Sequence, residues 1–168
     1  MEIAAAQKQF ISSWGAFSTY WGINRTMAQV HALLLISPDA LSQDDIMEKL
    51  NISRGNANMN VRELIDWGLV ERVIIPGERK EYYLAEKDIY KVATQILMER
   101  KKRELGPMLK LMDQLNHIEG EETDPQVKQF KETIAGIKKF GHQADRALDV
   151  VVKADESWFV STLLKFLS

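Results

Sequence analysis

The chain has 168 residues and a formal net charge of −2; 45% of its residues are hydrophobic and 27% are charged. These values are typical of one globular domain and exclude a disordered, collagen-like or low-complexity chain. Cysteine is absent, which excludes disulfide scaffolds, cysteine-ligated zinc, iron–sulfur clusters and cysteine nucleophiles. The balanced charge gives no composition-level indication of a nucleic-acid or anionic-membrane partner.

The N-terminus carries no recognisable targeting signal, because it opens with Glu2 and lacks a basic region followed by an apolar core. The longest apolar stretch lies within residues 30–36. It is far shorter than the ~18 residues that a membrane span needs. We therefore expect a cytoplasmic protein with no membrane partner.

Two helices are expected in the first 36 residues. Aromatic residues recur every three or four positions and form one helical stripe: Phe10, Trp14, Phe17 and Trp21. This spacing predicts a helix over residues 2–21, ended by Gly22. A second helix is predicted over residues 25–36, and it stops at Ser37 because the residue before a proline disfavours helix.

The next segment predicts two short helices joined by a tight turn. Ser42 is a candidate N-cap, and Asp45, three residues later, completes a short-armed capping box. After the turn at residues 51–53, Ser53 caps a further helix that runs to Gly68. Glycine is well suited to the position just after a helix end.

The periodicity changes after Gly68. Residues 69–75 are rich in valine and isoleucine, Pro76-Gly77 is a turn signal, and residues 81–84 are again strand-like. We expect a β-hairpin with a charged tip at residues 77–80. Beyond it we expect a helix over residues 86–105, kinked or restarted at Gly106-Pro107 and continuing to about residue 118. Two or three short helices then complete a mainly α chain.

This order of elements is the layout of a winged helix–turn–helix flanked by N- and C-terminal helices. Such a fold suits DNA because the major groove admits one α-helix, and a hairpin can reach the adjacent minor groove with a cation. We expect a helical region at residues 1–22, a DNA-binding domain at 23–86 and a C-terminal helical region at 87–168.

The helix after Ser53 has one apolar and one polar side. A helical wheel places Ala57, Val61, Leu64 and Ile65 on the core side. On the opposite side, Arg62 can bond guanine and Asn56 can bond adenine in the major groove. Gly55 removes bulk where the helix N-terminus nears the phosphate backbone. The alternative is an ordinary solvated helix face, but the cap, turn and hairpin in register favour DNA binding.

The sequence at residues 52–57 and 63–70 resembles the recognition helix of the MarR family of winged-helix transcriptional regulators, and residues 76–83 resemble that family's wing. Residues 14–17, 20–22 and 25–26 are similar to the GbsR-type subgroup, whose members repress genes for choline uptake and glycine-betaine synthesis. The resemblance implies a homodimeric repressor, joined by its N- and C-terminal helices, on a pseudo-palindromic double-stranded DNA operator.

The resemblance also implies which residues contact DNA: Ser53, Arg54, Asn56, Asn58, Met59 and Arg62 on the helix, with Arg79 and Lys80 at the wing. Gly55 joins this set through its place near the phosphate backbone. Many family members have an apolar residue where this chain has Asn60. That asparagine either flanks the groove or hydrogen-bonds within the fold, and the sequence leaves both open.

An effector site is suggested by four aromatic residues near the N-terminus, since aromatic faces bind quaternary ammonium ions such as choline or glycine betaine. They are Trp14, Phe17, Tyr20 and Trp21. Their helical spacing by itself better supports core or dimer packing, except at Tyr20, which lies off the stripe. The three histidines stand alone in sequence, so we expect no metal site, no cofactor and no enzymatic activity.

Two competing classes remain: a winged helix used for protein–protein interaction, and a metabolite-binding protein with a vestigial DNA surface. The charge of the motif bears on DNA affinity. Residues 51–83 balance five basic side chains against five acidic ones: Arg54, Arg62, Arg72, Arg79 and Lys80 against Glu63, Asp66, Glu71, Glu78 and Glu81. Because non-specific affinity comes mainly from phosphate neutralisation, we expect weak binding to bulk DNA and selectivity from specific contacts.

Overall fold

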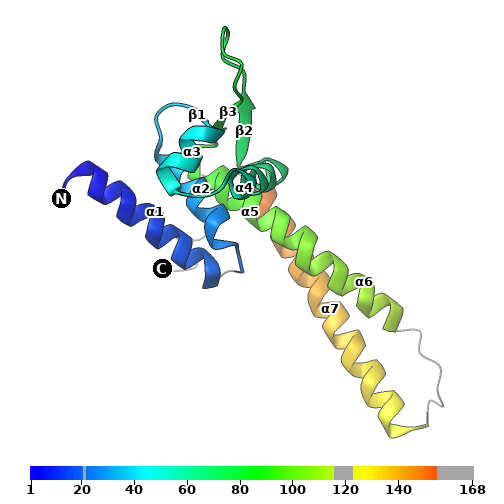
Figure 1. The fold of residues 1–168 in the computed structure, drawn as a ribbon. Helices are drawn as coiled ribbons and strands as arrows, with labels where there is room; N and C mark the ends of the chain where they lie inside the picture. Colours follow the sequence, from blue (N-terminus) through cyan, green and yellow to red (C-terminus); the bar gives the residue numbers. More distant parts are fainter. Residues whose placement is uncertain (21, 116–122, 155–168) are drawn as a thin grey trace, which may run out of the picture. The chain divides into compact units, whose positions relative to one another are not determined.

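The computed structural model describes residues 1–20, 22–115 and 123–154. Its helices and strands, in chain order, are α1 (Ile3–Tyr20), α2 (Arg25–Ile36), β1 (Leu41–Ser42), α3 (Gln43–Leu50), α4 (Arg54–Asp66), β2 (Val70–Val73), β3 (Tyr82–Ala85), α5 (Ile89–Arg100), η1 (Lys101–Leu105), α6 (Gly106–Leu115) and α7 (Pro125–Lys153) (Figure 1). The chain divides into two compact units, Met1–Val92 and Ala93–Ser168. The mainly helical fold with a small sheet is as predicted.

Helix α2 is the central core helix of the first unit. It begins and ends where the sequence predicts, with Asn24 as an additional N-cap whose side-chain oxygen accepts from the N–H groups of Thr26 and Met27. Most of its residues are buried. Helix α1 packs closely against it: a Cβ on Gly15 would lie 2.6 Å from Cγ of Gln29. The predicted end of α1 at Gly22 is confirmed by its left-handed backbone, φ 71°.

A lysine from beyond the hairpin closes the other end of α2. The ammonium of Lys87 donates to three main-chain carbonyls, those of Leu34 at 2.6 Å, Leu35 at 2.9 Å and Ser37 at 2.7 Å. The last carbonyls of a helix have no partner within the helix. Lys87 therefore ties the chain after β3 to the end of the central helix.

Helices α3 and α4 form the predicted helix–turn–helix. The capping box is confirmed, with Ser42 accepting from the N–H of Asp45 and the Asp45 carboxylate accepting from that of Ser42. Ser53 caps α4 by accepting from the N–H of Asn56. Gly68, with φ 70°, ends α4 and donates to the carbonyl of Ile65. Leu69 bonds the carbonyl of Leu64, so the helix ends in a Schellman motif.

The hairpin is part of a three-stranded antiparallel sheet of order β1-β3-β2. The two predicted strands are confirmed, and Val70 pairs with Ala85 at the base of the hairpin. Strand β1 was not predicted; in it Leu41 pairs with Tyr83 and Ser42 with Tyr82. A strand of two residues is too short to show an alternating hydrophobic pattern, and its partner strand lies about forty residues later in the chain. Only the tertiary fold creates it.

In the second unit, the expected restart at Gly106-Pro107 takes the form of a π-helical turn, η1, between α5 and α6. Pro107 has no N–H to donate within a helix, and the N–H of Gly106 bonds the carbonyl of Lys101, one residue further back than in an α-helix. The prediction of two or three short terminal helices is wrong over the described residues. Residues 125–153 form one helix, α7, because Gly136 and Gly141 weaken a helix without ending it.

Candidate nucleic-acid interface

All nine residues that the sequence assigned to DNA contact lie on the first unit, and none is buried. Seven of them belong to α4 or its cap, and Arg79 and Lys80 lie in the hairpin loop between β2 and β3. Figure 1 shows this hairpin projecting away from α2, α3 and α4. Helix α4 keeps its opposite side against the core, where Ala57, Val61 and Leu64 are buried. The arrangement is one exposed helix face beside one projecting hairpin.

The position of Asn60 answers the question that the sequence left open. Its side chain is only 1% exposed and lies within the fold. The Asn60 amide nitrogen donates to the main-chain carbonyl of Asn56 at 2.8 Å and to the Asn56 side-chain oxygen at 2.7 Å. The second bond holds the Asn56 amide in one orientation. Asn60 is thus a positioning residue for the half-buried side chain predicted to bond adenine.

Gly55 is not required by packing. A Cβ added there would meet no atom within 4 Å, and its backbone is not among the left-handed ones. Within this chain a larger residue would fit and would favour the helix. The space outside Gly55 is therefore free for an approaching molecule, as the sequence analysis expected for a phosphate backbone.

One carboxylate joins α4 to the hairpin. Oδ1 of Asp44, at the start of α3, lies 2.9 Å from Nη2 of Arg54, and Oδ2 lies 3.0 Å from Nζ of Lys80. The hydrogen bond from Lys80, more than the other charges nearby, lowers the pKa of the Asp44 carboxyl, and the same bond raises the pKa of Lys80. The sequence analysis missed Asp44, because nothing in the local pattern brings residues 44, 54 and 80 together.

The other two cations of this surface, Arg62 and Arg79, are exposed. Neither forms an ion pair with any residue in the part of the chain that the structure describes. Of the four cations on this surface, Arg62 and Arg79 are thus available to a ligand, whereas Arg54 and Lys80 are paired with Asp44.

The three described aromatic residues of the proposed effector site, Trp14, Phe17 and Tyr20, are exposed. Phe17 is 65% and Tyr20 83% exposed, and Trp14 is partly exposed with its ring 5.5 Å from that of Phe10. Trp21 lies outside the described residues. Stacking of Phe10 on Trp14 favours the packing interpretation for that end of the stripe.

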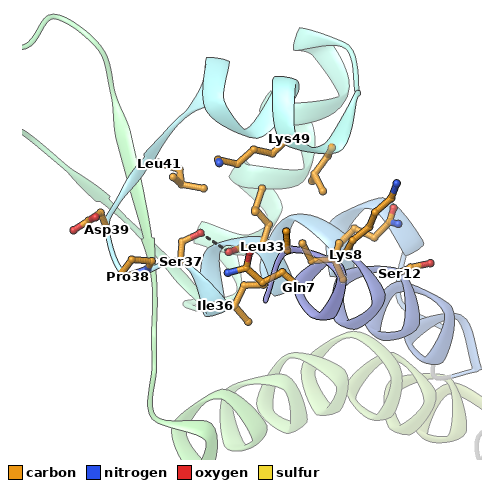
Figure 2. A pocket seen from close by; sticks show the side chains of 14 residues that line it. Gln7, Lys8, Ser12, Leu33, Ile36, Ser37, Pro38, Asp39, Leu41 and Lys49 are labelled. Carbon is orange, nitrogen blue, oxygen red and sulfur yellow. Dashed lines mark hydrogen bonds between the residues drawn. The ribbon is translucent and has the colours of Figure 1, made fainter. Parts of the chain in front are cut away.

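A cavity of about 710 Å³ opens elsewhere in the first unit. Helices α1, α2 and α3 and the loop before β1 line it, and Figure 2 shows Lys8 and Lys49 at its edge with Leu33 and Ile36 on the α2 side. Trp14, Phe17 and Tyr20 are not among the described residues that line it. No sequence signal marked this cavity, because its walls come from segments far apart in the chain.

The described residues contain no group of three His, Asp or Glu side chains that could hold a metal ion. His31 belongs to the core of α2, where burial, and secondarily the charge of Lys87, lowers its pKa to about 4. Over the same residues no helix has the length and apolar character needed to cross a membrane.

Comparison with known proteins finds similarity to one family of proteins. Residues 21–81 match the model of the MarR family. The HTH-type transcriptional repressor GbsR of Bacillus subtilis (strain 168) is 26% identical over 103 residues, 61% of this chain and 57% of that protein. The HTH-type transcriptional regulator MmpR5 of Mycobacterium tuberculosis is 26% identical over 76 residues, 45% and 46% of the two chains. The chain thus spans about half the length of these curated relatives.

A solved structure described as the crystal structure of a transcriptional regulator shares the fold, with a TM-score of 0.55 and 18% identity. The match covers 86% of this chain and 98% of the other. The family and both named relatives are transcriptional regulators rather than enzymes. The segment that matches the MarR family model, residues 21–81, holds the helix–turn–helix and most of the hairpin.

Proposed function

We propose that this protein is a sequence-specific DNA-binding transcriptional repressor that acts as a homodimer on a pseudo-palindromic operator. The observation that carries the proposal is helix α4: it is capped at both ends, buried on one side, and exposes Arg54, Asn58, Met59 and Arg62 beside a projecting hairpin. This is the combination that major-groove recognition requires, namely a rigid helix with base-reading side chains on its open face.

In the proposed complex, α4 enters the major groove with its N-terminal end nearest the DNA. Arg62 bonds the O6 and N7 atoms of a guanine, and Asn56, held by Asn60, faces an adenine. The hairpin then follows the backbone, with Arg79 and Lys80 reaching toward the minor groove. Two copies bind half-sites one helical turn apart, ~34 Å.

Apolar side chains left exposed on the helices outside the helix–turn–helix support a second copy as partner. Phe130, Ile137 and Phe140 are exposed on α7, and Ile3 and Phe17 on α1. Phe130, Ile137 and Phe140 are spaced seven and three positions apart and so share one face of α7, and contiguous exposed apolar surface marks interaction sites. Sedimentation at micromolar concentration tests this, and a monomer under conditions that support DNA binding contradicts the dimeric mechanism.

A small effector such as choline or glycine betaine remains part of the proposal. The exposed faces of Phe17 and Tyr20 support a cation–π contact with a quaternary ammonium ion. Titration of each compound against tryptophan fluorescence and operator affinity tests it. If neither signal changes with either compound, the quaternary-amine effector is excluded.

Selection of bound sequences from a random duplex pool tests the main proposal, because a palindromic product demonstrates both DNA recognition and dimer symmetry. The matched variants are Arg62→Ala, on the open face of α4, and Lys49→Ala, an exposed cation of α3 away from that face. We expect Arg62→Ala to cost about 1–3 kcal/mol and to relax the preference at one base position. Lys49→Ala should leave the preference unchanged.

The alternative is a winged helix that binds another protein and not DNA. The two classes differ in salt dependence, because phosphate contacts make DNA affinity fall steeply as salt is raised. A complete lack of salt-dependent DNA affinity would refute the regulator and favour this alternative.

A further inference from the structure

Asp44 occupies an unusual place on the candidate DNA surface. Its two carboxylate oxygens are divided between two cations that come from different elements, Arg54 at the start of α4 and Lys80 at the hairpin tip. Both of these cations are residues that the proposed function assigns to DNA. Their natural ligands in a complex are phosphate oxygens, which carry the same charge and the same acceptor geometry as the Asp44 carboxylate.

Besides its place in the first turn of α3, where a carboxylate is favourable, the Asp44 side chain takes no part in the hydrogen bonds that cap α3. The capping of α3 is performed by Ser42 and Asp45. The approach of α3 to α4 is held separately by Gln43, whose amide donates to the carbonyl of Arg54 at 3.0 Å. The Asp44 side chain is 47% exposed and reaches outward to the two cations. Removing its charge should therefore leave the helix–turn–helix folded.

We propose that Asp44 competes with DNA phosphates for Arg54 and Lys80 and so keeps these two cations from binding bulk DNA. This inference rests on the proposed function. On a random duplex the carboxylate retains both cations, and the surface offers only Arg62 and Arg79 to the backbone. On the operator, where α4 seats in the groove, phosphates displace the carboxylate from one or both cations. The residue thereby raises selectivity by lowering affinity for the wrong DNA.

The strength of the pairs suits such a role. Exposed ion pairs are worth little, because water and salt screen them and the side chains lose freedom on pairing. A phosphate held in place by other operator contacts can therefore replace Asp44, whereas a phosphate met by diffusion gains little from doing so. A buried pair would instead block both kinds of DNA.

The test compares Asp44→Asn with Glu48→Gln in the full chain. Glu48 is exposed on the same helix, so its neutralisation adds the same net charge without touching either pair. We expect Asp44→Asn to bind a random-sequence duplex about 3- to 10-fold more tightly than wild type. We expect its plot of log affinity against log salt to be steeper by about one to two units, since up to two further phosphates are contacted.

Two additional variants show whether the result depends on the amide group that Asp44→Asn introduces. Asp44→Ser should behave as Asp44→Asn, and Asp44→Glu, which keeps the charge, should restore the weak wild-type affinity. Thermal unfolding of all variants reports whether the domain remains folded. Equal gains for Asp44→Asn and Glu48→Gln, or weaker binding by Asp44→Asn, overturn the inference, because they indicate a net-charge effect or a positioning role for the pair.

Failure of the inference and failure of the proposed function have different signatures. If wild type and Asp44→Asn both bind duplex DNA with equal affinity and salt slope, only the competitor role is refuted. If no variant binds any duplex with salt-dependent affinity, the regulator and the competitor are refuted together. Binding by Asp44→Asn where wild type shows none supports both.

Discussion

The buried histidine of α2 makes the stability of the first unit, Met1–Val92, depend on pH. His31 is 3% exposed, and its Nε2 atom has no hydrogen-bond partner in the described part of the chain. Burial, and then the nearby charge of Lys87, lowers its pKa from 6.5 to about 4. The unfolded chain thus binds a proton between these values that the folded protein does not, so stability must fall as the pH falls through this range.

The size of the effect follows from the shift. Because one pKa unit corresponds to 1.36 kcal/mol, the whole shift is worth about 3 kcal/mol, and about 2 kcal/mol of it is lost between pH 7.5 and 5.0. The carboxyls of Asp44 and Asp45 also have lowered pKa values. Their contribution is present above the ordinary carboxyl pKa and is lost only at lower pH, outside this window.

Urea denaturation at pH 7.5 and 5.0 measures the loss, with His31→Leu as the test variant. We expect the free energy of unfolding of wild type to fall by about 2 kcal/mol between the two pH values. In His31→Leu most of that difference should disappear, whatever the variant's stability at pH 7.5. His142→Leu removes an exposed histidine from α7 and should keep the wild-type pH dependence. An equal pH-dependent loss in wild type and His31→Leu would refute the reasoning.

Two further predictions concern a glycine and a lysine. Gly55→Ala should raise the free energy of unfolding by up to about 1 kcal/mol, because alanine favours helix and no atom blocks its Cβ. The same change should weaken operator binding, because the added methyl group lies where the phosphate backbone is proposed to approach. Thermal unfolding measures the gain in stability and a DNA titration measures the loss of affinity. Tighter operator binding by Gly55→Ala would contradict the proposed close approach of DNA. Lys87→Met should destabilise the unit by about 1–2 kcal/mol, since it leaves three carbonyls at the end of α2 without their donor. Urea denaturation checks this, with Lys91→Met as control, and equal effects of the two variants would argue against the closing role of Lys87.

The helix–turn–helix could be predicted from the sequence because its signals are local. Ser42 with Asp45, Ser53 with Asn56, and Gly68 with Ile65 each act over three residues. Hydrogen bonds over that distance form within one turn of helix and need no other part of the chain. The MarR-family resemblance lay in the same residues, and the family match covers the same segment.

The length of α7 could not be predicted from such local signals. Its two glycines resemble helix ends when taken alone, but in the folded chain Gly141 lies where a Cβ would come 2.7 Å from Cδ2 of Leu109. The glycine thus allows α7 to pack closely on α6. Helical stability in proteins comes largely from such packing, and the sequence of one helix does not contain its partner.

The sequence by itself determined the order of the helices and of the hairpin from α1 to β3, the caps of α3 and α4, and the set of side chains on the open face of α4. The tertiary structure decided which of those side chains are available. It buried Asn60 against Asn56, paired β1 with β3, joined Lys87 to the end of α2 and divided Asp44 between Arg54 and Lys80. Each of the last three contacts joins residues at least ten positions apart, where a local pattern carries no information. The sequence lists the cations of this surface, and only their partners in space show that Asp44 pairs with Arg54 and Lys80.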